Sequence, residues 1–304
     1  MTELPLDQVR TLLAVVDEGT FDAAAAALHV TPSAVSQRVK ALERRTGRVL
    51  LLRTKPVRPT ESGEVIVRFA RQVARLERDA SGELGLSTAG EPTRVPVAVN
   101  ADSLATWFLD ALTRAPRQPR LCFELHREDE DHTAALLREG RVMAAVTSSP
   151  DPVPGCSVRS LGRMRYLPVA HPAFAARHLD GRPPRDVLAE APVVVFDRRD
   201  DFQDAFVRGL GGGHGAASAL RHYVPTSEGF ADAVAAGLGW GMVPEAQAAP
   251  LLRAGRLTRL DPDRHADVPL YWQQWRLHSP ALAALADAVA AAAAEALRTG
   301  AEGD

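Results

Sequence analysis

Residues 21–45, FDAAAAALHVTPSAVSQRVKALERR, constrain the fold of this chain more than any other stretch. Small alanines and Leu28 recur at helical spacing, the chain then turns, and a second helical pattern follows. Thr31 is placed to cap the second helix, and Pro32 suits its first position, where a missing N–H leaves no hydrogen bond unmade. The pattern predicts a helix-turn-helix.

The second helix is expected to begin near Ser33, to bury one face and to expose the other. Val35, Val39 and Leu42 have i, i+4, i+7 spacing and predict a buried stripe. Glutamine pairs with adenine through two hydrogen bonds, serine adapts to several bases, and lysine suits a phosphate. An ordinary amphipathic helix with a solvated face is the alternative interpretation. The opposite face carries Ser33, Ser36, Gln37 and Lys40.

Positive charge gathers around this motif. Residues 31–58 contain eight basic residues and one acid, Glu43, which gives a local net charge of +7 in a chain whose total is −2. Such a focused patch is typical of a surface that binds a polyanion. Residues 49–54 and 57–60 resemble two strands joined by a turn, which predicts a wing. The predicted DNA-binding residues are Thr31, Pro32, Ser33, Ser36, Gln37, Arg38, Lys40, Arg53, Lys55 and Arg58.

A long helix with a narrow apolar seam is expected after residue 60. Ile66, Phe69, Val73 and Leu76 follow 3, 4, 3 spacing, with arginines on the other faces. Such a seam predicts a partner helix from a second copy of the chain, in a homodimer or homotetramer, and packing onto its own chain is the alternative. A two-fold dimer would match a palindromic DNA site. From Ser81 onward, small residues predict a linker.

After residue 93, short apolar runs alternate with helical segments. Strands are expected at 95–99, 121–125, 142–146 and 193–196. This alternation predicts an α/β sheet, and such sheets bind ligands at the carboxyl ends of their strands. The helices are expected to begin near Ser103, Asp131, Phe202, Ser227 and Glu245.

The residues that follow these strands are rich in hydroxyls and carboxylates. Ser103 at a helix N-terminus predicts a carboxylate site, the nearby acids suit cationic groups, and Trp107 and Phe230 are expected to cover an aliphatic stem. A ligand with a carboxylate, an amine and a basic tail fits this set. Helix capping or a solvated loop is the alternative for each residue. The predicted ligand-binding residues are Asp102, Ser103, Trp107, Asp129, Asp131, Thr147, Ser148, Asp197, Ser227, Glu228 and Phe230.

Composition and missing motifs exclude several other classes. No apolar run reaches the roughly 18 residues of a membrane span, and the N-terminus lacks a secretory signal, which predicts a cytoplasmic protein without a membrane partner. Two cysteines make no disulfide scaffold, and Cys122 is expected to be a buried core thiol. The glycine run at 209–215 lacks the Gly-Lys-Ser/Thr of a phosphate loop, the histidines lack metal-binding spacing, and no nucleophile elbow occurs. No enzyme, metal or cofactor is therefore predicted.

A set of residues across the first 63 positions resembles the signature of LysR-type transcriptional regulators. The finer wording, SAVSQRVKALE, LLRTKPVRPTESG and NADSLATWF at 100–108, is similar to the lysine-export (ArgP/LysG) branch of that family, and the resemblance covers essentially the full length. The signature residues are Phe21, Ala24, Ala25, Leu28, Ser33, Ala34, Val35, Ser36, Leu42, Glu43, Gly47, Leu50, Leu51, Arg53, Thr60 and Gly63.

The resemblance implies an α/β protein with an N-terminal all-α winged helix-turn-helix at 1–60 and a linker and dimerisation helix with a hinge at 61–92. A two-lobed, periplasmic-binding-protein-like effector domain would follow, with lobe 1 at 93–162 plus 269–300 and lobe 2 at 163–268. The chain would return to lobe 1 through 270–273 and end in a helix at 281–298. The resembled branch senses lysine and arginine, so the implied effector is a basic amino acid.

The predicted function is a transcriptional regulator that binds promoter DNA, senses lysine or arginine and controls an exporter or metabolic gene. RNA polymerase is a candidate further partner. One alternative is a solute-binding or metabolic α/β protein with a fused basic DNA-binding module, and another is an architectural DNA-binding protein without effector dependence. The sequence leaves open activation against repression, lysine against arginine, and dimer against tetramer.

Overall fold

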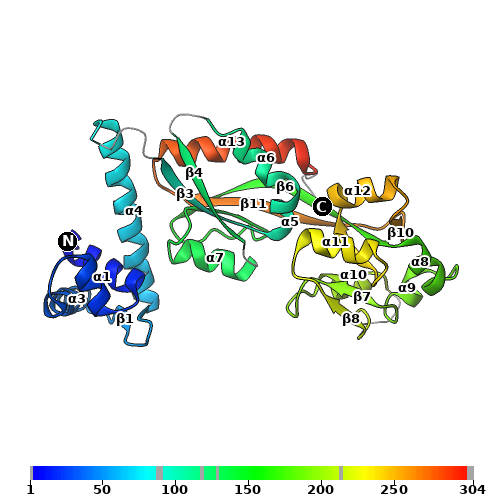
Figure 1. Cartoon of the computed structure of the whole chain (residues 1–304), viewed down its shortest axis with the longest axis horizontal. Coiled ribbons are helices and arrows are strands. Elements are labelled where there is room, and N and C mark those ends of the chain that lie inside the picture. Colours follow the sequence, from blue (N-terminus) through cyan, green and yellow to red (C-terminus); the bar gives the residue numbers. More distant parts are fainter. Residues whose placement is uncertain (1–2, 87–91, 117–119, 128–129, 212–214, 300–304) are drawn as a thin grey trace.

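The computed structural model describes residues 3–86, 92–116, 120–127, 130–211 and 215–299 of the 304-residue chain. A small helical domain at the N-terminus and an elongated α/β domain lie on either side of the long helix α4 (Glu61–Glu83) (Figure 1). No helix in the described residues is long and apolar enough to cross a membrane. Within the same residues, no group of three or more His, Cys, Asp or Glu side chains is placed to hold a metal ion.

The N-terminal domain contains the predicted helix-turn-helix. The Oγ1 of Thr31 accepts a hydrogen bond from the backbone N–H of Ala34 at 3.2 Å, so Thr31 is the N-cap of the second helix of the motif. Val35, Val39 and Leu42 are buried against the other helices, which confirms the predicted stripe. The elements are α1 (Leu6–Glu18), α2 (Phe21–Ala27), α3 (Pro32–Thr46), β1 (Leu51–Leu52) and β2 (Arg58–Pro59).

Strands β1 and β2 pair antiparallel and form the predicted wing, which is bound directly to the start of α4. The backbone N–H of Thr60 donates to the carbonyl of Leu50 at 2.9 Å, and the Thr60 hydroxyl accepts from the N–H of Gly63 at 3.0 Å. Ile66 and Val67, one turn further on, lie in the same apolar core as Leu50. The first turns of α4 are therefore part of the N-terminal domain.

The exposed stripe of α4 differs from the predicted seam at one position. Ile66 is only 7% exposed because it packs in the N-terminal core, whereas its neighbour Val65 is half exposed. Leu76 is 44% exposed, and Phe69 and Val73 are partly buried. The surface stripe thus consists of Val65, Phe69, Val73 and Leu76, and the assignment of Ile66 was wrong because a core contact takes its side chain.

Arg75 ties α4 to the α/β domain. It is 3% exposed, its guanidinium pairs with Asp79 at 2.9 Å, and it donates to the carbonyl of Arg94 at 3.2 Å and to the hydroxyl of Ser279 at 3.1 Å. A buried charge is tolerated when it is paired and makes further hydrogen bonds, as Arg75 does with Arg94 and Ser279. The linker helix is therefore fixed to the start of the sheet and to the cap of the last helix.

The α/β domain is built on one seven-stranded sheet with the order β10-β6-β11-β5-β3-β4, with β9 paired to β6. Strands β4, β3 and β5 are parallel, β11 pairs antiparallel with both β5 and β6, and β7 and β8 form a small parallel sheet. The strands are β3 (Thr93–Val99), β4 (Leu121–Arg127), β5 (Ala144–Thr147), β6 (Cys156–Ala170), β7 (Val193–Val195), β8 (Arg221–Tyr223), β9 (Gly241–Pro244), β10 (Thr258–Arg259) and β11 (Ala266–Trp275).

Helices cover the sheet in two groups. In lobe 1, α6 and α13 lie on one face and α7 on the other, and the remaining helices from α8 to α12 surround lobe 2 (Figure 1). The helical segments are α5 (Ala101–Ser103), η1 (Leu104–Phe108), α6 (Leu109–Thr113), α7 (Glu130–Arg138), α8 (Pro172–His178), α9 (Pro184–Val187), α10 (Phe202–Gly209), α11 (Ser227–Ala235), α12 (Glu245–Arg253) and α13 (Pro280–Ala296).

Two long antiparallel strands, β6 and β11, cross from one lobe to the other. Their register shifts between Leu270 and Tyr271, opposite Gly162. Gly162 has a φ of +125°, and a Cβ there would lie 2.8 Å from the carbonyl oxygen of Arg298, so only glycine fits. The predicted lobe boundaries at 162 and 269 lie beside this irregularity.

The predicted strands correspond to β3, β4, β5 and β7, and the predicted helix starts to α5, α7, α10, α11 and α12, all within two residues. The prediction for Cys122 was wrong, because its thiol is exposed. Strand β4 lies at the edge of the sheet, and Cys122 is on the face of β4 that is open to solvent. Cys156 is the buried cysteine, and burial raises its pKa to about 11.

Candidate functional site

The polar face of α3 lies open at the surface of the N-terminal domain. Ser33, Gln37 and Lys40 are exposed and Ser36 is half-buried, while the cap residues Thr31 and Pro32 are exposed just before them. The buried valine stripe on the other side of α3 holds this face outward. Side chains of types that can hydrogen-bond base edges are therefore presented by a helix, an element whose width fits the major groove.

Arg38 is the exception among the predicted contacts on α3. Its guanidinium turns toward α1, where Nη1 lies 3.5 Å from the hydroxyl of Thr11 and Nε lies 3.9 Å from a carboxylate oxygen of Asp7. Helix packing thus gives Arg38 partners inside its own domain. Arg38 was predicted to bind DNA as one of the eight basic residues of the patch, and a count of charges does not show that a side chain has a partner in its own domain.

The wing presents cations without neighbouring acids. Arg53, Lys55 and Arg58 are exposed, and none has an ion pair in the described part of the chain. Glu43, the one acid of the basic stretch, instead accepts the backbone N–H of Leu50 at 3.0 Å. Because this bond turns the carboxylate toward the strand, the positive charge of the surface is not neutralised locally.

A groove of about 550 Å³ runs from the exposed face of α3 to the segment that leads into the wing. It brings together polar side chains of types that can hydrogen-bond base edges and cationic side chains of types that can bind phosphate, as an interface with a polyanion requires. Arg44 and Arg48 belonged to the predicted basic patch but not to the predicted contact residues. The groove is lined by Gln37, Lys40, Glu43, Arg44, Gly47, Arg48 and Val49.

A second polar site lies where the two lobes meet. Asp102, in α5 at the carboxyl end of β3, accepts a hydrogen bond from the hydroxyl of Tyr166 at 2.7 Å and from that of Ser227 at 2.6 Å. Tyr166 lies in β6, and Ser227 is the first residue of α11 in lobe 2. The Asp102 carboxylate therefore joins the lobes. We call Asp102, Tyr166, Ser227, Asp200 and Gln247 the interlobe site.

The interlobe site is acidic, and its two carboxylates are partly buried. Burial raises the pKa of Asp102 and of Asp200. The charge of Asp102 also raises the pKa of Asp200, and the charge of Asp200 raises the pKa of Tyr166. Burial, with the nearby Asp102 carboxylate, also holds the pKa of Tyr166 well above its ordinary value. Among the described residues, no arginine, lysine or histidine forms an ion pair with either acid. Partly buried carboxylates without a counter-charge favour a cationic ligand.

Ser103 lies next to Asp102 but does not begin the helix. The side chain of Asn100 caps α5 by accepting a hydrogen bond from the backbone N–H of Ser103 at 3.0 Å. Contrary to the prediction, that N–H is therefore not free for a ligand. The Ser103 side chain is fully buried, and its hydroxyl has no hydrogen-bond partner in the part of the chain that the structure describes.

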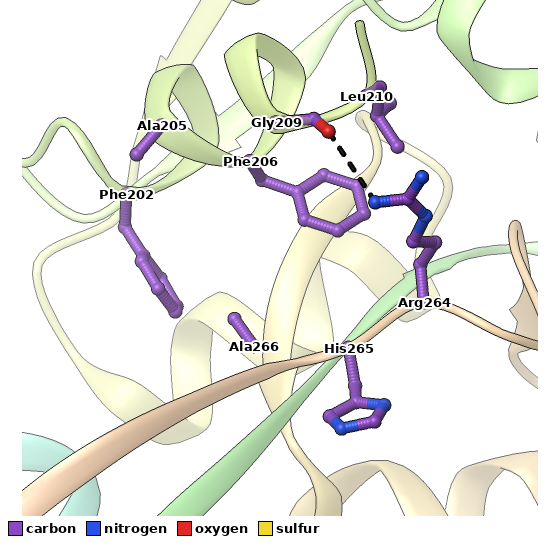
Figure 2. Close-up of a pocket in the computed structure, with 8 residues that line it drawn as sticks. All are labelled: Phe202, Ala205, Phe206, Gly209, Leu210, Arg264, His265 and Ala266. Carbon is purple, nitrogen blue, oxygen red and sulfur yellow. Dashed lines mark hydrogen bonds between the residues drawn. The ribbon is translucent and has the colours of Figure 1, made fainter. Parts of the chain in front are cut away.

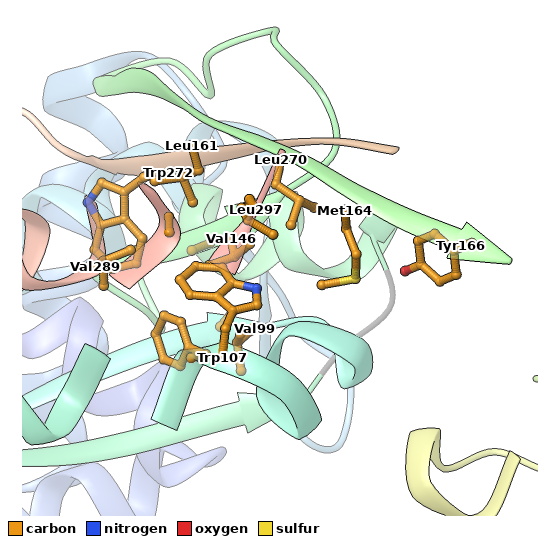
Figure 3. Packing of buried hydrophobic residues seen from close by; sticks show 14 of the residues in the cluster. Val99, Trp107, Val146, Leu161, Met164, Tyr166, Leu270, Trp272, Val289 and Leu297 are labelled. Atoms are coloured by element: carbon orange, nitrogen blue, oxygen red, sulfur yellow. The ribbon is translucent and has the colours of Figure 1, made fainter. Parts of the chain in front are cut away.

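The two predicted aromatic covers fill the cores of the lobes instead. Trp107 is 4% exposed and packs edge-on against Phe108, with ring centroids 5.7 Å apart, in the cluster that Figure 3 shows. Phe230 is equally buried, and its ring lies directly over Gly241. Both predictions assumed that a side chain in the first turn of a helix is accessible to a ligand. The position of each residue around its helix instead directs its ring into the core.

Four other predicted residues lie around the site without joining it. Thr147 is buried, and its hydroxyl donates to the carbonyl of Ser149 at 3.2 Å, and Ser148 is half-buried. Asp197 accepts two backbone N–H groups of its own turn. Glu228 is exposed, and its charge raises the pKa of Asp102. Of the predicted set, the structure brings Asp102 and Ser227 into direct contact.

Three members of the interlobe site were not among the predicted residues. Tyr166 lies on a strand that the sequence patterns did not indicate. Asp200 lies in the same turn as Asp197, which is the residue that the sequence predicts. Gln247 lies 3.2 Å from the hydroxyl of Ser227. An acid two residues before an apolar helix was the available signal for Asp200. Asp129 lies outside the described residues, as does the side chain of Asp131.

A separate pocket of about 250 Å³ lies on lobe 2 between α10 and the start of β11 (Figure 2). Its wall is largely apolar, with Arg264 and His265 at one side, and Arg264 donates to the carbonyl of Gly209 at 3.4 Å. Phe202 lines this pocket and also packs edge-on against Tyr166, with centroids 4.8 Å apart. The pocket therefore shares one wall with the interlobe site.

Comparison with protein families assigns both halves of the chain. Residues 6–64 match the model described as "Bacterial regulatory helix-turn-helix protein, lysR family", and residues 89–294 match "LysR substrate binding domain". A curated relative, the lysine export transcriptional regulatory protein LysG of Corynebacterium efficiens, is 48% identical over 292 residues, which cover 95% of this chain and 98% of the relative.

Solved structures agree over the full length. The crystal structure of ArgP from Mycobacterium tuberculosis matches with a TM-score of 0.91 and 48% identity, over 98% of this chain and all of that one. Full-length LysG from Corynebacterium glutamicum with bound effector Arg matches with a TM-score of 0.86 and 43% identity, over 97% of this chain and all of that one. With its basic winged helix-turn-helix, linker helix and two-lobed sensor, the chain belongs to the LysR family of DNA-binding transcriptional regulators.

Proposed function

We propose that this regulator senses a basic amino acid, arginine or lysine, in the interlobe site, and controls transcription of an amino-acid exporter or a metabolic gene. The observation that carries the proposal is the pair of partly buried carboxylates, Asp102 from lobe 1 and Asp200 from lobe 2, with no cationic partner in the described residues. The bound arginine of the LysG structure and the lysine export in the curated relative's name support the same effector class.

The cationic group of the effector would bind Asp102 through charge-assisted hydrogen bonds, which are stronger than those between neutral groups. Because its neighbours come from both lobes, an effector at Asp102 would bind one lobe arrangement better than another. That difference in affinity is what a switch requires.

The protein would act as a homodimer or homotetramer in the cytoplasm, without catalysis, with RNA polymerase as a further partner. The stripe of Val65, Phe69, Val73 and Leu76 on α4 offers an apolar face to a second copy. Two copies related by a two-fold axis would place two recognition helices on one palindromic site.

Calorimetry with the full-length protein tests the effector. Arginine and lysine are expected to give binding heat, whereas leucine and glutamate give none, because only the basic side chains supply a cation for Asp102. A DNA footprint on the gene's own upstream region, with and without arginine, is expected to change. Binding of arginine with no change in footprint would favour a solute-binding protein with a fused DNA-binding module. Binding of an aromatic acid instead would contradict the proposal.

Substitutions on the recognition helix and on the wing are expected to have different effects. Gln37→Ala should reduce discrimination between the promoter and a random duplex by about 1–3 kcal/mol, because a two-bond contact with a base is lost. Arg53→Ala should weaken both duplexes alike and lower the salt slope by about one unit, because it contacts phosphate. Titrations of both duplexes at several salt concentrations measure the two effects. Equal losses on both duplexes for Gln37→Ala would rule out base reading by that residue.

A further inference from the structure

The geometry points to Tyr166 and Ser227 as the residues that orient the carboxylate of Asp102 for a guanidinium group, so that the interlobe site selects arginine over lysine. This inference rests on the proposed function, since it takes a basic amino acid as the ligand of Asp102. It adds a specificity role for two hydroxyls that belong to the protein itself.

The two hydroxyls donate hydrogen bonds to different oxygens of the Asp102 carboxylate. Tyr166 donates to Oδ2 at 2.7 Å and Ser227 donates to Oδ1 at 2.6 Å, so each oxygen accepts one internal hydrogen bond. A carboxylate has about two acceptor positions on each oxygen, so each oxygen keeps one for a ligand. A guanidinium donates two parallel N–H bonds, one to each oxygen of a single carboxylate. The remaining acceptors of Asp102 therefore match the donors of arginine in number and arrangement.

Both hydroxyls are held rigidly. Tyr166 lies within the β6 ladder, is 7% exposed and packs edge-on against Phe202. Ser227 is buried at the first position of α11, and its hydroxyl also lies beside Gln247. Two fixed donors on opposite oxygens prevent the carboxylate from rotating about its last bond. Pairing in one plane with a guanidinium then requires no further ordering of Asp102.

An ammonium group gains much less from this orientation. The lysine ammonium is a compact charge with three donors that rotate freely, so it binds a carboxylate oxygen from many directions. The planar guanidinium requires both oxygens in its own plane. Loss of an orienting hydroxyl is therefore expected to weaken arginine binding more than lysine binding, which a general loss of structure would not do.

The same contacts connect recognition to the arrangement of the lobes. Asp102 belongs to lobe 1, whereas Ser227 stands on α11 in lobe 2 and Tyr166 on the segment of β6 that pairs with β9. The carboxylate is oriented only when the lobes stand as they do in this structure. A guanidinium would therefore bind this arrangement in preference to a more open one.

The experiment measures arginine and lysine affinities by calorimetry for the full-length wild type and for Tyr166→Phe and Ser227→Ala. Wild type is expected to bind arginine more tightly than lysine. Each variant is expected to lose about tenfold in arginine affinity and about twofold in lysine affinity, because one hydrogen bond to a charged group is removed. Tyr271→Phe is the matched control, since that hydroxyl on β11 makes no hydrogen bond in the described part of the chain.

Each outcome decides a different point. Equal losses for both amino acids, tighter binding of arginine by either variant, or a wild type that binds the two equally would overturn the orienting role. A wild type that binds neither amino acid would overturn the proposed function itself. Thermal unfolding of each variant identifies a folding defect, and the ratio of the two affinities remains informative for any variant that folds, because both are measured on the same sample.

Discussion

Asp102→Asn is expected to weaken arginine binding about 100-fold or more and to abolish the effector response of the DNA footprint. Removal of one partner of a buried, hydrogen-bonded charge pair costs about 2–5 kcal/mol, and each 1.4 kcal/mol is about tenfold in affinity. Asparagine keeps the shape of the side chain, and its one oxygen can still accept a hydrogen bond from a hydroxyl. What it loses is the charge and one of the two acceptor oxygens that a guanidinium requires.

The unliganded variant is expected to be at least as stable as wild type. Burial raises the pKa of Asp102, which means that the folded protein disfavours the charged form. A neutral amide removes that penalty, so urea unfolding should give an unchanged or higher free energy of unfolding. This separates a lost binding group from a damaged fold. Effector-free DNA binding should also persist, because the hydrogen bonds of Asp102 in the described part of the chain all join residues of the α/β domain.

A matched substitution is available on the same lobe as Ser227. Asp232 is exposed on α11, so Asp232→Asn changes the same charge without touching the interlobe site. It should bind arginine as wild type does. If Asp102→Asn bound arginine within about twofold of wild type, less than one neutral hydrogen bond, Asp102 would not be the cation site.

The helix-turn-helix could be predicted almost completely because its determinants are local. The Thr31 cap bonds three residues along the chain, and the Val35, Val39 and Leu42 stripe follows from helical spacing. Arg38 and Glu43 behave differently, since their orientation depends on partners from another helix and from the wing. Spacing along one element does not indicate which of its charged side chains is taken by a neighbour.

The interlobe site could be predicted only in part. The rule that ligands bind at strand ends led to Asp102 and Ser227, which are 125 residues apart and yet in contact. Tyr166 was missed because β6 is a long antiparallel strand through both lobes, and the patterns used predict short strands between helices. Trp107 and Phe230 stand at suitable positions in the sequence, but the packing of their helices turns both rings into the cores.

Gly63→Ala is expected to unfold or severely destabilise the N-terminal domain, with a loss of about 4 kcal/mol or more in its free energy of unfolding. A Cβ at this position would lie 1.9 Å from the carbonyl oxygen of Leu50 and 3.1 Å from the Cβ of Pro59. The same carbonyl accepts the N–H of Thr60, so it has no room to move without breaking the joint between wing and linker helix. The obstacle is backbone, which cannot turn aside as a flexible side chain can.

The consequence should be confined to one half of the protein. Leu50 begins the wing that carries Arg53 and Arg58, so promoter affinity is expected to be lost, whereas arginine binding by the interlobe site is retained. Gly209→Ala is the control, because a Cβ at Gly209 meets no atom within 4 Å, and its stability should change by about 0.5 kcal/mol or less. Urea unfolding, mobility shift and calorimetry on the same samples measure the three properties. Promoter binding by Gly63→Ala at wild-type affinity would show that α4 does not pack on the wing as closely as this structure places it.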